Sequence, residues 1–203
     1  RCDHYEDILG TYLVQLSARK MGVDESEEAT ELLKSIGDFE RISDHAVNIL
    51  ESAEELRGKG IEFSETAQQE LQVLGEAMRE IMDYAYRSFT AVDAQTARRI
   101  EPVEEVVDDM VATLRTNHIR RLRDGQCTVY AGLVFLDILI NAERIADQCS
   151  NLGVYTISQF DPSVMNSHHE YIHRLHQGND PVFNREYQEK HEKYFGMLSA
   201  IND

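Results

Sequence analysis

The chain has few of the residues that interrupt helices and lacks the usual signs of secretion. It contains no tryptophan, 3 prolines and 11 glycines in 203 residues, and no low-complexity tract, which excludes disorder over most of its length. Its 3 cysteines form no Cys-x-x-Cys pair, which argues against a disulfide framework and a sulfur-ligated zinc site. No signal peptide is visible. We expect a soluble fragment in a reducing, cytoplasmic setting.

Basic residues are scarce relative to acidic ones, 20 against 37, which gives a formal net charge of −17. Such a surface repels nucleic acid and anionic lipid, and it suits cations or basic partners. We therefore expect no nucleic-acid partner. Long apolar runs are also missing: the longest, residues 130–140, contains Asp137 and is too short to cross a bilayer.

Apolar residues recur at three- and four-residue spacing, and no stretch alternates as a half-buried strand does. This periodicity predicts an all-α fold with long antiparallel helices. The first expected helix runs from the start to about Ser17, and the second opens at the acidic segment "DESEE" and continues to about Leu56. Three more run from the cap Ser64 to near Ala91, from the cap Asp93 to about residue 123, and from Thr128 to roughly Ser158. Two shorter helices follow. On the first helix we expect a buried side made of Ile8, Leu9, Tyr12, Leu13 and Leu16.

An internal repeat divides the chain. The segment "ERISDHAVNI" from Glu40 matches "ERIADQCSNL" from Glu143, so that Glu143 follows Glu40 by 103 residues. At an offset of 102, Asp3 and Asp7 fall on Glu105 and Asp109. We therefore expect two tandem three-helix repeats, residues 1–91 and residues 92–203, the second with a helical C-terminal tail.

Each repeat carries acidic residues four positions apart in a seam that reads as apolar. In the second helix this pair is Glu40 and Asp44, and in the fifth it is Glu143 and Asp147. Residues four apart leave the same face of a helix, so their carboxylates repel each other unless something offsets the charge. Arginine partners, raised pKa values and bound cations are the three candidates, and cations fit best. A solvated acidic face is the alternative.

These motifs resemble the PhoU family of phosphate-signalling proteins, whose three-helix repeats carry a doubled (E/D)xxxD metal motif. The segments "DHYEDILGTYLVQL", "FSETAQQEL", "EPVEEVVDDM" and "HIRRLRDGQCTVYAGLVFLDIL" are similar to the C-terminal PhoU-like domain of bacterial sodium/phosphate cotransporter-type proteins. Carried over position by position, the resemblance implies a set of metal ligands: Asp3, Asp7, Glu40, Asp44, Glu105, Asp109, Glu143 and Asp147. Glu6 directly precedes Asp7, and Asp108 directly precedes Asp109, so the ligand at each of these two places is open by one residue. His45 is a candidate neighbour of the site.

The resemblance also implies a function. It is that of a metal-binding cytoplasmic regulatory domain of a sodium-dependent phosphate cotransporter, which modulates phosphate uptake and is not an enzyme. The implied cofactors are divalent or trivalent metal ions, iron foremost, with zinc, manganese or magnesium as alternatives. The implied partner is a transmembrane transporter domain upstream in the same polypeptide, which would place the chain at the cytoplasmic face of the membrane. A homo-oligomer is a further possible assembly.

Three rival functions stay open. One is a free-standing PhoU-type phosphate-signalling adaptor, and another is a purely structural interaction domain whose acidic residues are merely solvated. The third is a carboxylate-bridged metal oxidase, which needs a Glu-x-x-His pair on two helices, whereas only Glu170 and His173 fit that spacing. The tail segment "HHEYIHRLH" places His169, His173 and His176 on one helical face, which predicts either a solvated face or a zinc or nickel surface site.

Overall fold

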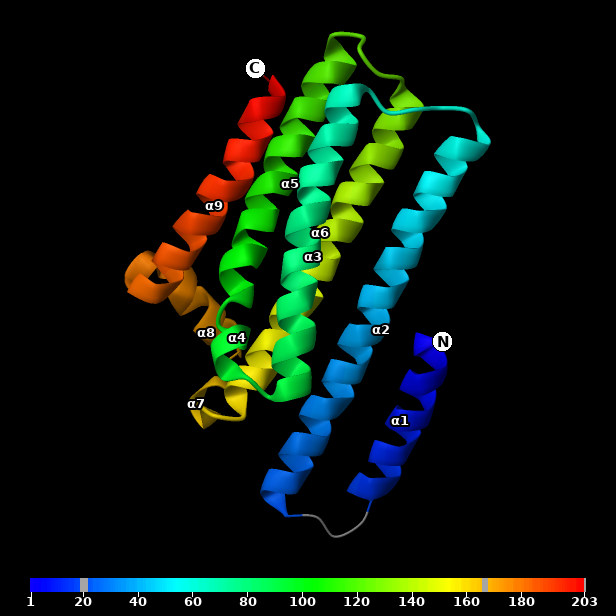
Figure 1. Cartoon of the computed structure of the whole chain (residues 1–203). Coiled ribbons are helices and arrows are strands. Elements are labelled where there is room, and N and C mark those ends of the chain that lie inside the picture. Colours follow the sequence, from blue (N-terminus) through cyan, green and yellow to red (C-terminus); the bar gives the residue numbers. More distant parts are fainter. Residues whose placement is uncertain (19–21, 166–167, 203) are drawn as a thin grey trace.

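The computed structural model describes residues 1–18, 22–165 and 168–202. These residues are helical almost throughout and contain no strand, which confirms the predicted all-α helical bundle (Figure 1). In chain order the elements are α1 (Cys2–Ser17), α2 (Val23–Gly58), α3 (Glu65–Ala91), α4 (Ala94–Ala97), α5 (Ile100–Arg123), α6 (Val129–Ser158), α7 (Pro162–Met165), α8 (His168–Arg174), the π-helical turn η1 (Leu175–Asn179) and α9 (Pro181–Asn202).

The predicted caps begin the helices where the sequence places them. The Ser64 hydroxyl accepts a hydrogen bond from the backbone N–H of Ala67 at 3.3 Å at the start of α3. The Thr128 hydroxyl does the same for Ala131 at 3.1 Å at the start of α6. Asp93 caps the short α4 instead of a long helix, and α5 begins after it. Pro102 lies in the first turn of α5, where backbone N–H groups have no partner within the helix.

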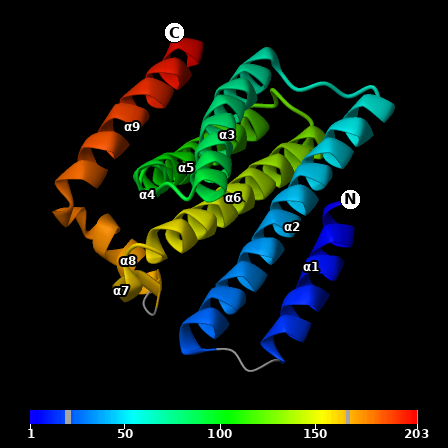
Figure 2. The ribbon, with the colours of Figure 1, turned by 60° about the horizontal axis from the view of Figure 1, so that its bottom comes forward.

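Helix α6 lies at the centre of the bundle. It packs against α2, α3, α4, α5 and α7, and its residues Leu139, Ala146 and Leu152 are fully buried. Figure 2 shows α2 and α1 on one side of α6, while α3 and α5 lie on the other. The neighbours of α6 bury Val134, Phe135 and Leu139 of its apolar run, whereas Leu133 and Ile140 of the same run are exposed.

One hydrophobic core joins α3, α5, α6 and α9. Its fully buried side chains include Ile81, Met110, Leu139 and Tyr194, one from each of these helices. Helices of both predicted repeats therefore share a core. The division into residues 1–91 and 92–203 stays a prediction.

Helix α1 lies at the edge of the bundle, where it packs along α2 (Figure 1). Only Leu13 of its predicted buried side is buried, while Ile8, Leu9 and Tyr12 are 50%, 44% and 61% exposed. The prediction of a broad buried side is therefore wrong for the described chain. The reason is geometric, because contact with one neighbouring helix covers only a narrow stripe of a helix.

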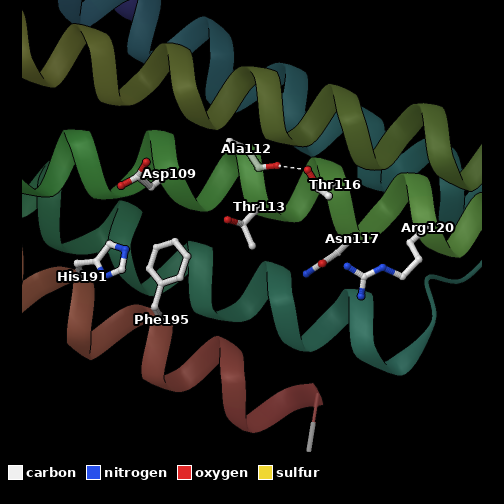
Figure 3. A pocket seen from close by; sticks show the side chains of 8 residues that line it. All are labelled: Asp109, Ala112, Thr113, Thr116, Asn117, Arg120, His191 and Phe195. Carbon is white, nitrogen blue, oxygen red and sulfur yellow. Dashed lines mark hydrogen bonds between the residues drawn. The ribbon is translucent and has the colours of Figure 1, made fainter.

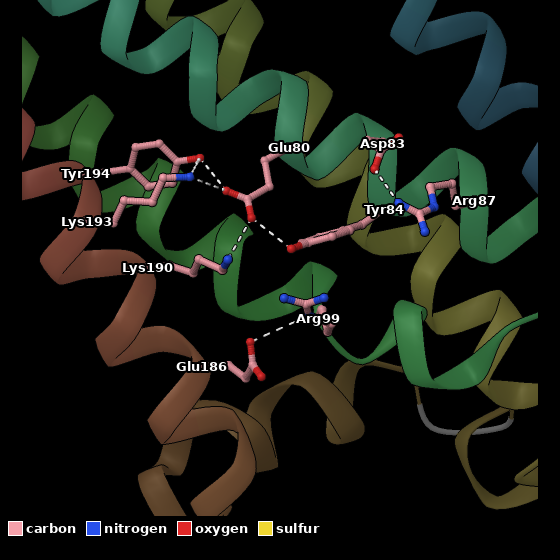
Figure 4. A network of polar contacts seen from close by, with 9 residues as sticks. All are labelled: Glu80, Asp83, Tyr84, Arg87, Arg99, Glu186, Lys190, Lys193 and Tyr194. Atoms are coloured by element: carbon pink, nitrogen blue, oxygen red, sulfur yellow. Dashed lines mark hydrogen bonds and ion pairs between the residues drawn. The ribbon is translucent and has the colours of Figure 1, made fainter.

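A polar cluster fastens α9 to α3 (Figure 4). The Glu80 carboxylate accepts hydrogen bonds from Lys190 at 2.7 Å, Tyr84 at 2.8 Å, Lys193 at 3.0 Å and Tyr194 at 2.5 Å. Burial opposes the ionisation of Glu80, but the hydrogen bonds from Lys190 and Tyr194 outweigh it and lower the pKa of Glu80 to about 2. One carboxylate thus organises four side chains at the contact between α3 and α9.

Replacing Glu80 by alanine should destabilise the protein by about 3 kcal/mol, because the ammonium group of Lys190 would be left unpaired and nearly buried. Urea unfolding at pH 7 measures this loss. The control is Asp83→Ala on the same helix, where Asp83 pairs with Arg87 in solvent; we expect a change below about 0.5 kcal/mol. Equal effects of the two substitutions would contradict a structural role for Glu80.

Candidate functional site

The first carboxylate cluster lies between α1 and α2. It consists of Asp3, Glu40 and Asp44, whose carboxylate oxygens come within 4.8 Å of one another. Burial, then the neighbouring Asp44, and then Glu6 and Asp3 of α1 raise the pKa of Glu40. Four acidic side chains thus act on one small volume at the edge of the bundle. Asp44 is exposed and Glu40 half-buried, so this pair lies beside the core and not within it.

Two predicted neighbours of this cluster lie elsewhere. Asp7 is exposed and does not belong to the described group of converging carboxylates. His45 turns toward α6, where its Nδ1 atom lies 2.9 Å from Oδ1 of Asn141. The imidazole therefore links α2 to α6, whereas the side chain of Asp44 is exposed to solvent.

The second carboxylate cluster lies between α5 and α6. Helix α5 contributes acidic residues at i, i+3, i+4 and i+7, a spacing that keeps them on one helical face. Helix α6 contributes the predicted pair, which is half-buried and lies at the margin of the core. The second carboxylate cluster comprises Glu101, Glu104, Glu105, Asp108, Glu143 and Asp147.

Burial and mutual repulsion dominate the electrostatics of the second cluster. Glu101 and Glu104 are only 6% and 8% exposed. Burial, and then the charges of Glu101 and Asp108, raise the pKa of Glu104 to about 9. Burial, and then Glu143 and Asp147, raise the pKa of Asp108 to about 7. At neutral pH Glu104 therefore holds a proton unless a cation replaces it, while Asp108 is close to its titration midpoint.

A cavity of about 650 Å³ opens over this cluster. Glu101, Glu104, Asp108 and Asp147 line it. Among the described residues, Oδ1 of Asp108 and Oε1 of Gln148, which also lines the cavity, are buried without a hydrogen-bond partner. Unsatisfied buried oxygens are rare in folded proteins, and carboxylate and amide oxygens are ligands for hard or borderline cations. The residues present therefore fit a metal ion.

Asp109 of α5 does not line this cavity. Its carboxylate accepts a hydrogen bond from the Tyr187 hydroxyl of α9 at 2.6 Å. It lines a separate groove of about 490 Å³ between α5 and α9, beside His191 and Phe195 (Figure 3). Burial, followed by this hydrogen bond, raises the pKa of Tyr187 to about 12. Asp109 thus belongs to the contact with α9.

The carboxylate pairs and their helices match a known family. Residues 1–53 and 71–156 fit the family described as the PhoU domain, and these ranges include both clusters and most of α1, α2, α3, α5 and α6. The chain belongs to the PhoU domain family. The C-terminal segment from α7 to α9 lies beyond the matched residues.

A curated relative is the phosphate-specific transport system accessory protein PhoU homolog 1 of Thermotoga maritima. It is 30% identical over 121 residues, which cover 60% of this chain and 51% of the relative. The chain thus spans about half the length of this relative. No solved structure matches the chain.

These comparisons correct the predicted partner. The prediction of a transmembrane transporter domain in the same polypeptide is wrong, because the matching relative is named as an accessory protein of a transport system and not as a transporter. None of the described helices combines the length and the apolar character that a membrane span requires. The relative's name favours the adaptor alternative over the cotransporter domain.

Within the PhoU domain, the side chains of the predicted ligands point in different directions. It brings Asp3, Glu40 and Asp44 together in the first cluster, and it brings Glu105, Glu143 and Asp147 near one another around the second. Asp108 faces acidic residues of α6, whereas Asp109 accepts a hydrogen bond from Tyr187 of α9. Which of the two binds metal stays a prediction.

Sequence reasoning missed Glu101 and Glu104, and it assigned His176 to a separate surface site with His169 and His173. The spacing of Glu101, Glu104, Glu105 and Asp108 on one helical face was a signal that could have found the two glutamates. The contact between His176 and Glu101 gave no comparable signal, because 75 residues separate them in the chain.

The raised pKa of Glu104 predicts how stability changes with pH in metal-free protein. The unfolded chain releases this proton near pH 4.5, while the folded chain holds it to about 9. Stability should therefore fall as pH rises between these values, by at most about 1.4 kcal/mol per pH unit for one proton. Glu104→Gln should flatten this slope and stabilise the protein at pH 8.

Urea unfolding in chelator from pH 5 to pH 9 tests this expectation. The matched control is Glu51→Gln on the exposed face of α2, which should keep the slope of the unchanged protein. Identical slopes for the two variants would show that Glu104 ionises normally in the folded state.

Proposed function

We propose that this chain is a PhoU-type adaptor that regulates phosphate transport and binds metal ions at its two carboxylate clusters. The observation that carries the proposal is the presence, in a PhoU domain, of two converging groups of carboxylates on facing helices. The name of the Thermotoga maritima relative supports the link to phosphate transport. We place its action in the cytoplasm, where an adaptor can meet a transport system.

The metal ions would act first on the packing of the helices. In the first cluster Asp3 of α1 faces Glu40 and Asp44 of α2, and like charges at this distance repel. A cation between them would offset this repulsion and hold α1 against α2. In the second cluster a cation would do the same for α5 and α6. Iron, zinc, manganese and magnesium are all compatible with carboxylate ligands.

Metal occupancy would thereby control the surface that a partner meets. Helix α1 exposes Tyr5, Ile8 and Leu9 at the edge of the bundle, and its position depends on its contact with α2. Binding at the first cluster restricts that position. A transport system could therefore distinguish the metal-bound adaptor from the metal-free one.

Metal binding is tested by the double substitution Glu40→Ala with Glu143→Ala, which removes one carboxylate from each cluster. Protein purified without an affinity tag should contain metal by elemental analysis, and addition of iron, manganese or zinc to the chelated protein should raise its melting temperature by several degrees. The double variant should contain less metal, and added metal should raise its melting temperature by less.

The matched control is Glu51→Ala with Asp137→Ala, which removes two exposed acidic residues from the same two helices. This control should keep its metal. Absence of metal from the unchanged protein, with a melting temperature that none of the three metals alters, would refute the metal-binding part of the proposal.

The regulatory role is tested in the native cell. Deleting the gene for this chain should change the rate of uptake of radiolabelled phosphate, because the adaptor would no longer act on transport. The unchanged gene and the Glu51→Ala, Asp137→Ala control should restore the rate, and the Glu40→Ala, Glu143→Ala variant should not. An uptake rate unaffected by the deletion would contradict a role in phosphate transport.

A further inference from the structure

The segment beyond the family match reaches into the second carboxylate cluster. His176 in η1 places its Nε2 atom 2.8 Å from Oε1 of Glu101 and its Nδ1 atom 3.2 Å from Oε2 of Glu105. Ligand atoms of His176, Glu101 and Glu104 all lie within 4.8 Å of one another. The three side chains line the same cavity.

Glu104 is the buried member of the group of His176, Glu101 and Glu104 that has no partner of opposite charge in the described part of the chain. It is 8% exposed, and among the described residues it has neither a hydrogen bond nor an ion pair. The other strongly buried glutamates have partners: Oε2 of Glu70 forms an ion pair with Nη1 of Arg121 at 2.7 Å, and Glu101 accepts a hydrogen bond from the Ser150 hydroxyl. An ionised carboxylate buried without a partner is strongly unfavourable, so Glu104 can lose its proton at neutral pH only when a cation occupies the cavity.

We propose that His176 is a nitrogen ligand, contributed by the C-terminal segment, of a divalent transition-metal ion of the zinc class held together with Glu101 and Glu104. This inference rests on the proposed function, and it adds the class of metal and a ligand from outside the acidic motifs. Bonds of about 2.0–2.2 Å from three ligands to one ion bring the ligand atoms within roughly 3.5 Å of one another, so contraction of the group by about 1 Å suffices.

The second nitrogen of the imidazole has a partner suited to this role. A metal-bound histidine usually donates its other ring N–H to a carboxylate, which fixes the ring and makes the ligating nitrogen more basic. Glu105 lies at Nδ1 and leaves Nε2 directed toward Glu101 and the cavity. Glu105 is thus a positioning residue for His176.

The mixed ligand set distinguishes the two clusters of the chain. Asp3, Glu40 and Asp44 offer oxygen alone, a set that hard cations such as magnesium accept. An imidazole nitrogen shifts the preference toward zinc and neighbouring transition metals. The first cluster and the His176 site should therefore take up different metals.

Packing of the tail holds His176 in place. Its ring lies 5.7 Å from the ring of Phe183, which is buried at the start of α9. Helix α9 in turn packs against α3 and α5, with Glu80 at its contact with α3. The turn between His176 and α9 passes through Gly178 at a φ of +75°, a conformation that side chains with a Cβ rarely adopt. The histidine is thus anchored from its C-terminal side.

Zinc K-edge X-ray absorption tests the inference. The Glu40→Gln, Asp44→Asn double variant disables the first cluster, and one equivalent of zinc is then added to the chelated protein. We expect outer-shell scattering from an imidazole ligand in this background. Adding His176→Gln should abolish that signal and weaken zinc affinity by about tenfold or more in a chelator competition.

The matched control is His173→Gln in the same background. His173 lies one turn earlier in the tail, is exposed and contacts Gln177, so its loss should leave both the scattering and the affinity unchanged. Glu104→Gln provides a second variant that keeps the tail intact. It should weaken zinc binding even if His176→Gln perturbs the packing of the tail.

Each adverse result has a distinct meaning. Zinc held by oxygen ligands alone, or an unchanged affinity in His176→Gln, would overturn this inference and leave the proposed metal-binding function standing. No zinc binding in the background variant would also overturn it, while the first cluster could still bind metal in the unchanged protein. Absence of metal binding in the unchanged protein would refute the proposed function itself.

Discussion

The enclosure of α6 by its neighbours is the constraint on which the rest of the structure depends. Helices α2, α3 and α5 all pack on α6, so the side chains that α6 directs into these contacts are apolar, such as Phe135, Leu139 and Leu152. The acidic pair Glu143 and Asp147 occupies a margin of this packing, opposite the acidic face of α5. Because these carboxylates lie beside the core, burial removes water from them. This loss of solvation raises the pKa of both Glu104 and Asp108.

The two carboxylate clusters share a sequence motif but differ in their surroundings. The first lies between α1 and α2 at the edge of the bundle, where water reaches Asp3 and Asp44. The second lies beside the core, and the tail covers it through His176. The same acidic spacing therefore forms an exposed patch in one repeat, and in the other it lines an open cavity in which Glu101 and Glu104 are buried. Burial, and not the motif, makes the second cluster depend more strongly on a counter-charge.

The tail links the stability of the bundle to the geometry of the second cluster. Glu80 holds α9 through Lys190 and Tyr194, and α9 carries Phe183, against which the His176 ring packs. Contacts of α9 with α3 thereby help to position His176 beside Glu101 and Glu105 of α5. Because the tail lies outside the residues that match the PhoU domain, this arrangement is a property of the chain and not of the shared family motif.

The sequence by itself determined the features that depend on neighbours along the chain. Helical periodicity, the caps Ser64 and Thr128, and the convergence of Glu40 with Asp44 all follow from residues within four positions of one another. Only the tertiary structure decided which helix each side chain faces. Asp108 and Asp109 differ by about 100° around α5, so packing alone directs the first to α6 and the second to α9. It also brought His176 to Glu101 across 75 residues, a contact that no local pattern encodes.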